Sequence, residues 1–246
     1  MQFNYRKSLI RVKENILDVL FPPRCPICEK ILKVNNNQVC KECRKEIRYI
    51  QEPACKKCGK MLLCEEQEYC YDCNKQEHIF IRGLSLWIYD KNIKKSLYRF
   101  KYNNKQEYAK IYANEIMMHH GRQMKGWNVD AIIPIPLHKS KLRSRGFNQA
   151  EILAKELSKL LVIPCYNNYV MRSKKTLPQK SLNDKQRKNN LKNAFKIGVN
   201  DVKLNKVILI DDIYTTGITV DSVTEVLNYA GVNEVYVITV GIGEGL

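Results

Sequence analysis

The sequence predicts an α/β protein in which a doubly wound, mostly parallel sheet follows a small cysteine-rich module. Two observations lead to this fold class. Apolar runs without polar alternation are typical of strands buried on both faces of a parallel sheet, and they occur at residues 131–136, 207–210 and 235–240. Nine of the ten cysteines lie within residues 25–73. A chain of 246 residues has room for one substantial core and one such module.

The cysteines form an internal repeat with a period of 30 residues. Each half holds two Cys-x2-Cys pairs separated by eleven residues, and two such pairs can close a tetrahedral zinc site. We expect two structural Zn²⁺ ions and Cys64 as a spare thiol; disulfides would need an oxidising compartment, for which nothing else argues. The repeat favours sequential filling and leaves interleaving open. The ligands are Cys25, Cys28, Cys40 and Cys43, followed by Cys55, Cys58, Cys70 and Cys73.

Three segments are expected along the chain. Residues 1–24 contain an amphipathic helix at 3–20, which packs on the core or, as the alternative, lies on a membrane surface. Residues 25–78 form the zinc module, and residues 80–246 form the sheet domain. No apolar run approaches the roughly 18 residues of a membrane span, and the N-terminus lacks the apolar centre of a secretory signal. These features predict a cytoplasmic protein.

Within the sheet domain, apolar spacing predicts the elements in order. The expected strands are residues 80–90 (a strand or hairpin), 131–136, 162–171, 207–210 and 235–240. The expected helices are residues 93–102, residues 107–119, a helix from Ala150, and a helix that runs to about Tyr229 before Gly231. Pro134 places its strand at an edge or makes a strand end there. Residues 137–149 predict a basic loop, and residues 172–196 a long mobile loop.

Residues 206–219 carry the clearest chemical pattern. Asp211 and Asp212 follow the buried strand at 207–210, and a hydroxyl-rich turn precedes the next helix. Such a turn directs backbone N–H groups and a positive helix end at one point, which suits a phosphate. The acidic pair can accept hydrogen bonds from a sugar diol or hold Mg²⁺. The alternative is an ordinary turn with Asp and Thr as helix caps. The turn residues are Thr215, Thr216, Gly217 and Thr219.

This stretch resembles the phosphoribosyl pyrophosphate (PRPP) loop of type I phosphoribosyltransferases. The resemblance implies the type I phosphoribosyltransferase fold. It also implies that Asp211 and Asp212 hold the ribose hydroxyls and that the turn at residues 215–219 cradles the 5′-phosphate.

Basic side chains are concentrated in a few segments. The formal charge is +17, and two filled tetrathiolate sites would leave +13, because eight thiolates and two Zn²⁺ ions together subtract four charges. Residues 91–125 carry nine Lys and Arg against two acids, and residues 172–196 carry nine against one. We expect a polyanionic partner, either nucleic acid, pyrophosphate or both; a generally basic, solvated surface is the alternative.

The basic loop at residues 137–149 follows a parallel strand, so it faces the same sheet edge as the acidic pair, where a pyrophosphate would lie. A solvated basic turn is the alternative. We expect Lys141 and Arg145 to act in catalysis by stabilising the departing pyrophosphate, together with Arg187 from the long loop. The remaining residues assigned to the pyrophosphate loop are Leu137, His138, Lys139 and Arg143.

The order of motifs resembles the ComF family. These motifs are the cysteine pairs, Lys101-Tyr102, residues 134–137 with 145–149, the series Arg172, Gln179 and Arg187, and the acidic-threonine loop. The resemblance implies a zinc finger joined to a type I phosphoribosyltransferase domain that acts in DNA uptake during natural transformation. It also implies contact with incoming single-stranded DNA and with other parts of the uptake machinery, peripherally at the inner face of the membrane.

Three functions from different classes remain open on the sequence alone. The chain is a Mg²⁺-dependent phosphoribosyltransferase with an unknown acceptor, a DNA-binding accessory protein that retains PRPP binding, or an adaptor built on the zinc module. Type I enzymes usually add a hood, the segment that reads the nucleobase, and only six residues follow the last expected strand. The zinc module is a candidate for that hood.

Overall fold

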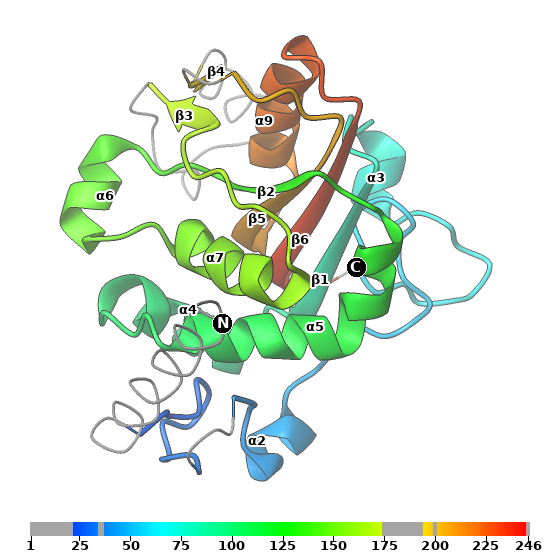
Figure 1. Cartoon of the computed structure of the whole chain (residues 1–246). Helices are drawn as coiled ribbons and strands as arrows, with labels where there is room; N and C mark the ends of the chain where they lie inside the picture. Colours follow the sequence, from blue (N-terminus) through cyan, green and yellow to red (C-terminus); the bar gives the residue numbers. More distant parts are fainter. Residues whose placement is uncertain (1–21, 34–36, 174–193, 199–200, 245–246) are drawn as a thin grey trace, which may run out of the picture.

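The computed structural model describes residues 22–33, 37–173, 194–198 and 201–244 (Figure 1). The helix expected at residues 3–20 lies outside these ranges, as do Gln179 and Arg187 of the expected long loop. Within the described ranges, no helix combines the length and the apolar character needed to cross a bilayer.

Four parallel strands form the central sheet, in the order β1-β6-β5-β2 (Figure 1). The strands are β1 (Arg82–Ile88), β2 (Ala131–Pro134), β5 (Lys206–Tyr214) and β6 (Glu234–Ile242). The parallel α/β fold predicted from the apolar runs is therefore confirmed. The strand β2 lies at one edge of the sheet and ends at Pro134. Proline has no N–H to donate to a neighbouring strand, so it is tolerated at an edge or a strand end.

Helices cover both faces of this sheet, as in a doubly wound fold (Figure 1). Side chains of β5 alternate: Ile208 and Ile210 pack into the core on one face, and Val207 and Leu209 into the core on the other. The first face is covered by α4 (Lys91–Tyr102), α5 (Tyr108–Gly126) and α7 (Gln149–Leu161), and the second by α9 (Ile218–Tyr229). The helix α9 ends before Gly231, whose φ of +92° suits glycine.

Two local predictions are wrong. The basic segment at residues 137–149 is not a loop throughout, because it contains the short helix α6 (Lys139–Arg145). The His138 side chain caps its first turn by accepting from the Ser140 N–H, and Gly146 closes it with a φ of +81°. These end signals stabilise a helix that has no apolar stripe.

The strand expected at residues 162–171 is also largely absent. Val162 has a φ of +59° and caps α7, and Cys165 makes only one isolated parallel bridge, to Ile132 of β2. What forms instead is β3 (Val170–Arg172), antiparallel to β4 (Phe195–Ile197) in a separate two-stranded sheet.

The cysteine-rich segment repeats the same ribbon twice. The Cys25 N–H donates to the Lys30 carbonyl over 2.9 Å, and the Cys55 N–H donates to the Lys60 carbonyl over 2.7 Å. Glu29 and Gly59, 30 residues apart, both have positive φ, of +63° and +75°. Each ribbon has a short helix after its third cysteine, α2 (Lys41–Glu46) and α3 (Tyr71–Lys75). The internal repeat expected from the sequence is confirmed.

The two ribbons lie on opposite faces of the sheet. Cys25 and Cys43 of the first ribbon belong to the core beneath α4 and α5, whereas Cys55 and Cys58 of the second belong to the core beneath α9. The segment between them follows the outer edge of β1: the Ile50 N–H donates to the Leu86 carbonyl, and the Ile88 N–H to the Arg48 carbonyl. In Figure 1, α2 accordingly lies at the bottom of the molecule and α3 at its upper right.

Candidate functional site

The eight predicted zinc ligands form two groups, Cys25, Cys28, Cys40 and Cys43, and Cys55, Cys58, Cys70 and Cys73, with the sulfur atoms of each group within 4.8 Å of one another. Filling is therefore sequential rather than interleaved. A tetrahedral ion with Zn–S bonds of about 2.3 Å has sulfur–sulfur edges of about 3.8 Å. The Cys28–Cys40 and Cys58–Cys70 sulfur distances are 3.7 and 3.6 Å. Both groups fit Zn²⁺.

The acidic pair lies at the carboxyl end of β5. The Asp212 N–H donates to Asp211 Oδ1 over 2.8 Å, and Asp212 Oδ2 forms an ion pair with Lys101 Nζ of α4. The Lys101 and Asp212 side chains are only 17% and 16% exposed, so this pair is partly desolvated.

The two carboxyl groups have opposite protonation preferences. Burial and the neighbouring Asp212 carboxylate raise the pKa of Asp211 well above its usual range. Burial acts in the same direction on Asp212, but the Lys101 ammonium outweighs it and lowers the pKa of that carboxyl. Asp212 is therefore a carboxylate near neutral pH. A cation or a hydrogen-bond donor beside Asp211 would offset the free-energy cost of burying its charge.

The hydroxyl-rich turn joins β5 to α9. Gly217 has a φ of +74°, and its neighbours leave no room for a side chain: a Cβ there would lie 2.4 Å from the Tyr214 hydroxyl and 2.6 Å from His78 Cε1. The backbone can therefore pass this point only as glycine. The turn ends at the N-terminus of α9, a twelve-residue helix whose free N–H groups favour an anion.

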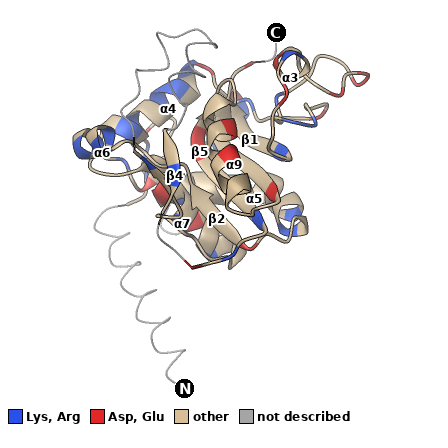
Figure 2. Cartoon of the chain, turned by 90° about the horizontal axis from the view of Figure 1, so that it is seen from above, with Lys and Arg blue, Asp and Glu red and all other residues tan. Residues whose placement is uncertain are grey.

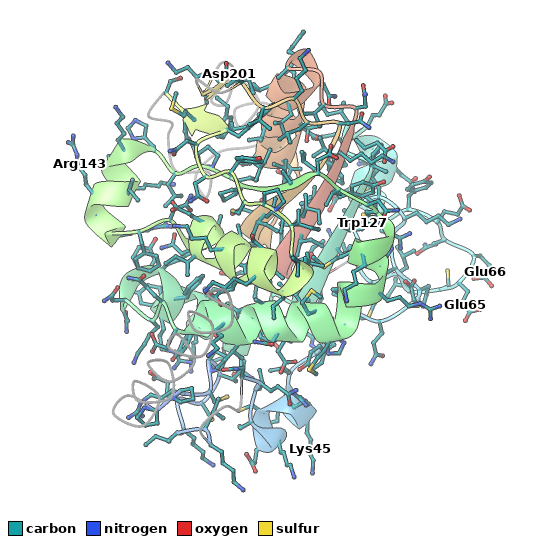
Figure 3. All side chains as sticks on the ribbon, viewed as in Figure 1. Lys45, Glu65, Glu66, Trp127, Arg143 and Asp201 are labelled. Atoms are coloured by element: carbon teal, nitrogen blue, oxygen red, sulfur yellow. The ribbon has the colours of Figure 1, made fainter. Side chains whose placement is uncertain are left out.

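One cavity of about 570 Å³ joins these parts, a size suited to a small phosphorylated ligand. Eight of the predicted site residues line it: Asp211, Asp212, Thr215, Gly217, Thr219, Leu137, Lys141 and Arg145. Of the residues predicted for the PRPP and pyrophosphate sites within the described ranges, four are outside this lining: Thr216, His138, Lys139 and Arg143. Arg143 points away from the body of the molecule at the far end of α6 (Figure 3). Arg187 lies outside the described residues.

Cations line the wall that faces the acidic pair. Burial, together with the charges of Arg172 and Arg145, lowers the pKa of Lys141. The Arg145 guanidinium lies 4.9 Å from the Tyr102 ring centroid and donates to the Tyr102 hydroxyl over 3.0 Å and to Gln149 Oε1 over 2.8 Å. These contacts fix Arg145 before any ligand arrives, and a bound polyanion would relieve the crowding of the cations.

The wall contributed by α4 was not anticipated as part of the site. Lys94, Leu97, Tyr98, Lys101 and Tyr102 line the cavity. The sequence predicts a helix with its cations directed outward; of these, Lys94 and Lys101 line the cavity, and Lys101 reaches Asp212 of β5. The only signal in the sequence was the pair Lys101-Tyr102, which contributed to the family resemblance without a role of its own.

The cysteine module does not form the expected hood. Among its described residues none lines the cavity, and the second ribbon instead touches the back of the Gly217 turn. Tyr89 and residues of α4 line part of the cavity instead.

Comparison with known families agrees with this architecture. Residues 16–74 match the "Double zinc ribbon domain" family, and residues 104–241 match the "Phosphoribosyl transferase domain" family. The second match covers more than half of the chain, and the chain belongs to the phosphoribosyltransferase domain family.

The chain is also similar to bacterial proteins named for competence and for DNA utilization. The chain is 44% identical to competence protein F of Haemophilus influenzae over 110 residues, 44% of this chain and 48% of that protein. It is 31% identical to the DNA utilization protein YhgH of Escherichia coli over 134 residues, 53% and 59% of the two chains. It is 29% identical to competence protein ComFC of Bacillus subtilis over 136 residues, 55% and 53%. The chain thus spans about half the length of these relatives.

Proposed function

We propose that this protein binds PRPP with Mg²⁺ in the cavity between β5, α4 and α6, and that it acts on DNA during uptake. The proposal rests on the cavity described above, in which the acidic pair and the Thr215–Gly217 turn lie together with Lys141, Arg145 and Arg172. The relatives, which are competence and DNA utilization proteins, support the second half of the proposal.

Each end of PRPP has a complementary part of the cavity. The turn and the N-terminus of α9 offer N–H and hydroxyl donors to the 5′-phosphate. Asp211 and Asp212 accept from the ribose hydroxyls or hold Mg²⁺, which neutralises pyrophosphate charge. Lys141 and Arg145 hold the pyrophosphate, and Leu137, His138, Lys139, Arg143 and Arg187 are assigned to the same end from the sequence.

Phosphoribosyl transfer is the second candidate function. Pyrophosphate leaves C1 of the ribose as the acceptor bonds to that carbon, and catalysis by this chain would consist of holding the leaving pyrophosphate with Lys141 and Arg145. The acceptor would enter beside Tyr98, which lines the cavity and is 59% exposed. Release of pyrophosphate from PRPP separates an enzyme from a protein that only binds it.

A surface for single-stranded DNA adjoins the cavity. Lys and Arg side chains gather on α4 and α6, which lie side by side in Figure 2 and are joined by the Arg145–Tyr102 hydrogen bond. Exposed Tyr98 and Tyr102 lie between these cations, and tyrosine rings among cations suit an unpaired strand, whose bases can stack. An adaptor role for the zinc module predicts no binding at this surface.

The deciding experiment is calorimetric titration of the zinc-loaded protein with Mg²⁺-PRPP, with and without single-stranded DNA. We expect binding by the wild type and none by the double variant Asp211→Ala/Asp212→Ala, with zinc content and circular dichroism unchanged. Unaltered PRPP affinity in that variant would refute the site assignment. No binding by the wild type would leave the DNA-binding role as the leading function.

A further inference from the structure

The second zinc ribbon supports the back of the phosphate-binding turn through one buried side chain, His78. The His78 side chain is 1% exposed, and His78 Nδ1 lies 2.7 Å from Asp221 Oδ2 in the first turn of α9. His78 Nε2 lies 3.3 Å from the hydroxyl of Tyr214, the last residue of β5. One ring thus bridges the residue before the turn and the helix after it.

Asp221 joins the ribbon segment to α9 at two further points. Its Oδ1 accepts from the Ile79 N–H over 3.2 Å, and its Oδ2 accepts from Gln76 Nε2 over 3.4 Å. The Asp221 N–H meanwhile donates to the Gly217 carbonyl over 2.8 Å, the first hydrogen bond of α9. The carboxylate that anchors the ribbon therefore belongs to a residue in the first turn of the helix.

The fit at Gly217 makes this support stiff. A Cβ at that position would lie 2.6 and 2.9 Å from His78 Cε1 and Nδ1, so the ring occupies the space directly behind the turn. Any retreat of His78 would open a void there, and the turn would gain conformations that do not direct its N–H groups at one phosphate.

The position of His78 depends in turn on the ribbon. His78 follows α3, which Cys70 caps and which contains Cys73, and Tyr214 belongs to the same core cluster as Cys55, Cys58 and Cys70. A ribbon of this size holds its shape through its metal, because it has too few apolar residues for a core of its own. Loss of the second zinc ion would therefore release His78.

We propose that His78 is a positioning residue for the 5′-phosphate turn, and that occupancy of the second zinc site, but not of the first, controls sugar-phosphate binding. This inference rests on the proposed function for its ligand. The first ribbon contacts α4 and α5 on the opposite face of the sheet. It provides a control, because its zinc site also has four cysteine ligands, none of which contacts the turn.

The test measures the two ends of the ligand separately. Ribose 5-phosphate reports on the turn, and inorganic pyrophosphate with Mg²⁺ reports on Lys141 and Arg145. We expect His78→Ala to weaken ribose 5-phosphate about tenfold, the factor that corresponds to 1.4 kcal/mol, and to change pyrophosphate affinity less than twofold. His78→Gln, which can keep one of the two hydrogen bonds, should recover part of the loss. Equal weakening of both ligands would contradict the proposal.

A matched pair of cysteine variants tests the role of zinc. Cys73→Ser should lose one zinc ion and most ribose 5-phosphate affinity, whereas Cys28→Ser should lose one zinc ion and keep that affinity. An equal effect of the two substitutions would refute control by the second site alone.

Hydrogen exchange provides a readout that needs no ligand. In His78→Ala the amides of residues 217–221 should exchange at least tenfold faster, with those of α5 unchanged. If the wild type does not bind ribose 5-phosphate but this acceleration is seen, the proposed function fails and the positioning role stands. Unchanged exchange refutes the positioning role whatever the ligand does.

Discussion

Asp211 is held at a thermodynamic cost in the absence of a ligand. Its pKa is raised by burial and by Asp212, so the folded state binds this proton more tightly than the unfolded state. Stability therefore falls as the pH rises from the ordinary Asp value through the raised one. Two adjacent carboxylates at one strand end are a poor choice for stability alone, which is consistent with a functional reason for keeping them.

Replacing Asp211 with Asn should consequently stabilise the free protein. We expect a higher free energy of unfolding at pH 8, because the neutral Asn amide carries no charge to bury, and a smaller gain at pH 5, where more of Asp211 remains protonated. Urea denaturation at the two pH values measures it. The same variant should lose ribose 5-phosphate binding. A loss of stability at pH 8 would mean that Asp211 is ionised and well paired.

The acidic pair and the glycine turn could be placed together from the sequence because they are contiguous. Asp211, Asp212, Thr215 and Gly217 fall within seven residues, so their spacing alone brings them together. Lys101 could not be assigned as the partner of Asp212, because the pair joins α4 to β5 across 111 positions and arises only when both elements pack on the sheet. His78 was missed for the same reason: its partners Tyr214 and Asp221 are 136 and 143 residues away.

Among the elements, those with strong apolar periodicity were predictable. The strand β5 continues past the predicted run as far as Tyr214. The helices α5 and α6 were predicted less well, each for a different reason. The helix α5 continues seven residues past the predicted end at residue 119, because His120 turns inward to the Ser85 carbonyl rather than ending the helix. The helix α6 depends on caps, not on an apolar stripe, so periodicity could not find it.

Docking of the first ribbon to α5 depends on Glu115, which is fully buried. Glu115 Oε1 accepts from the Val39 N–H over 2.9 Å and from Arg44 over 2.7 Å, and Oε2 accepts from the Tyr49 hydroxyl over 2.8 Å. One carboxylate thus satisfies three donors from the ribbon segment.

Removing that carboxylate should loosen the first ribbon selectively. We expect Glu115→Ala to lower the free energy of unfolding by about 3 kcal/mol, because it leaves a buried amide and a cation without their acceptor. Zinc should also leave the first site faster when a chelator is added. Thermal denaturation and chelator-driven zinc release measure the two effects. Glu115→Gln, which keeps an acceptor oxygen, should lose less stability. Equally faster zinc release from both sites would contradict a role confined to the first ribbon.

At the scale of the whole molecule, the zinc module is not a separate body beside the sheet domain. Its two ribbons pack into the two cores on opposite faces, and the segment between them lies along β1. The cysteine spacing predicted both metal sites, but a spacing repeat carries no information on which face each ribbon covers. The domain boundary at residues 78–80 stays a prediction, and the buried contacts cross it.

The placement of charge over the molecule leads to the last prediction. The exposed cations of α4 and α6 adjoin the cavity, whereas the exposed cations of α2 lie on the first zinc ribbon, at the bottom of the view where Figure 3 marks Lys45. We expect Lys95→Glu/Arg143→Glu, which changes no residue of the cavity lining, to weaken single-stranded DNA binding by about tenfold at low salt. The slope of log affinity against log salt should become shallower by about 0.7 for each phosphate that the variant no longer neutralises. Fluorescence anisotropy with a labelled oligonucleotide over a salt series measures both.

The matched control is Lys41→Glu/Lys45→Glu on α2, which reverses the same number of charges on the zinc module. If DNA binds beside the cavity, this control should leave the salt slope unchanged, because a localised contact and not the net charge of the whole protein sets the number of ions released. Both double variants carry the same net charge, so a general attraction to a basic surface predicts equal losses. A larger loss in the α2 variant would move the DNA contact to the first zinc ribbon and separate it from the cavity beside β5.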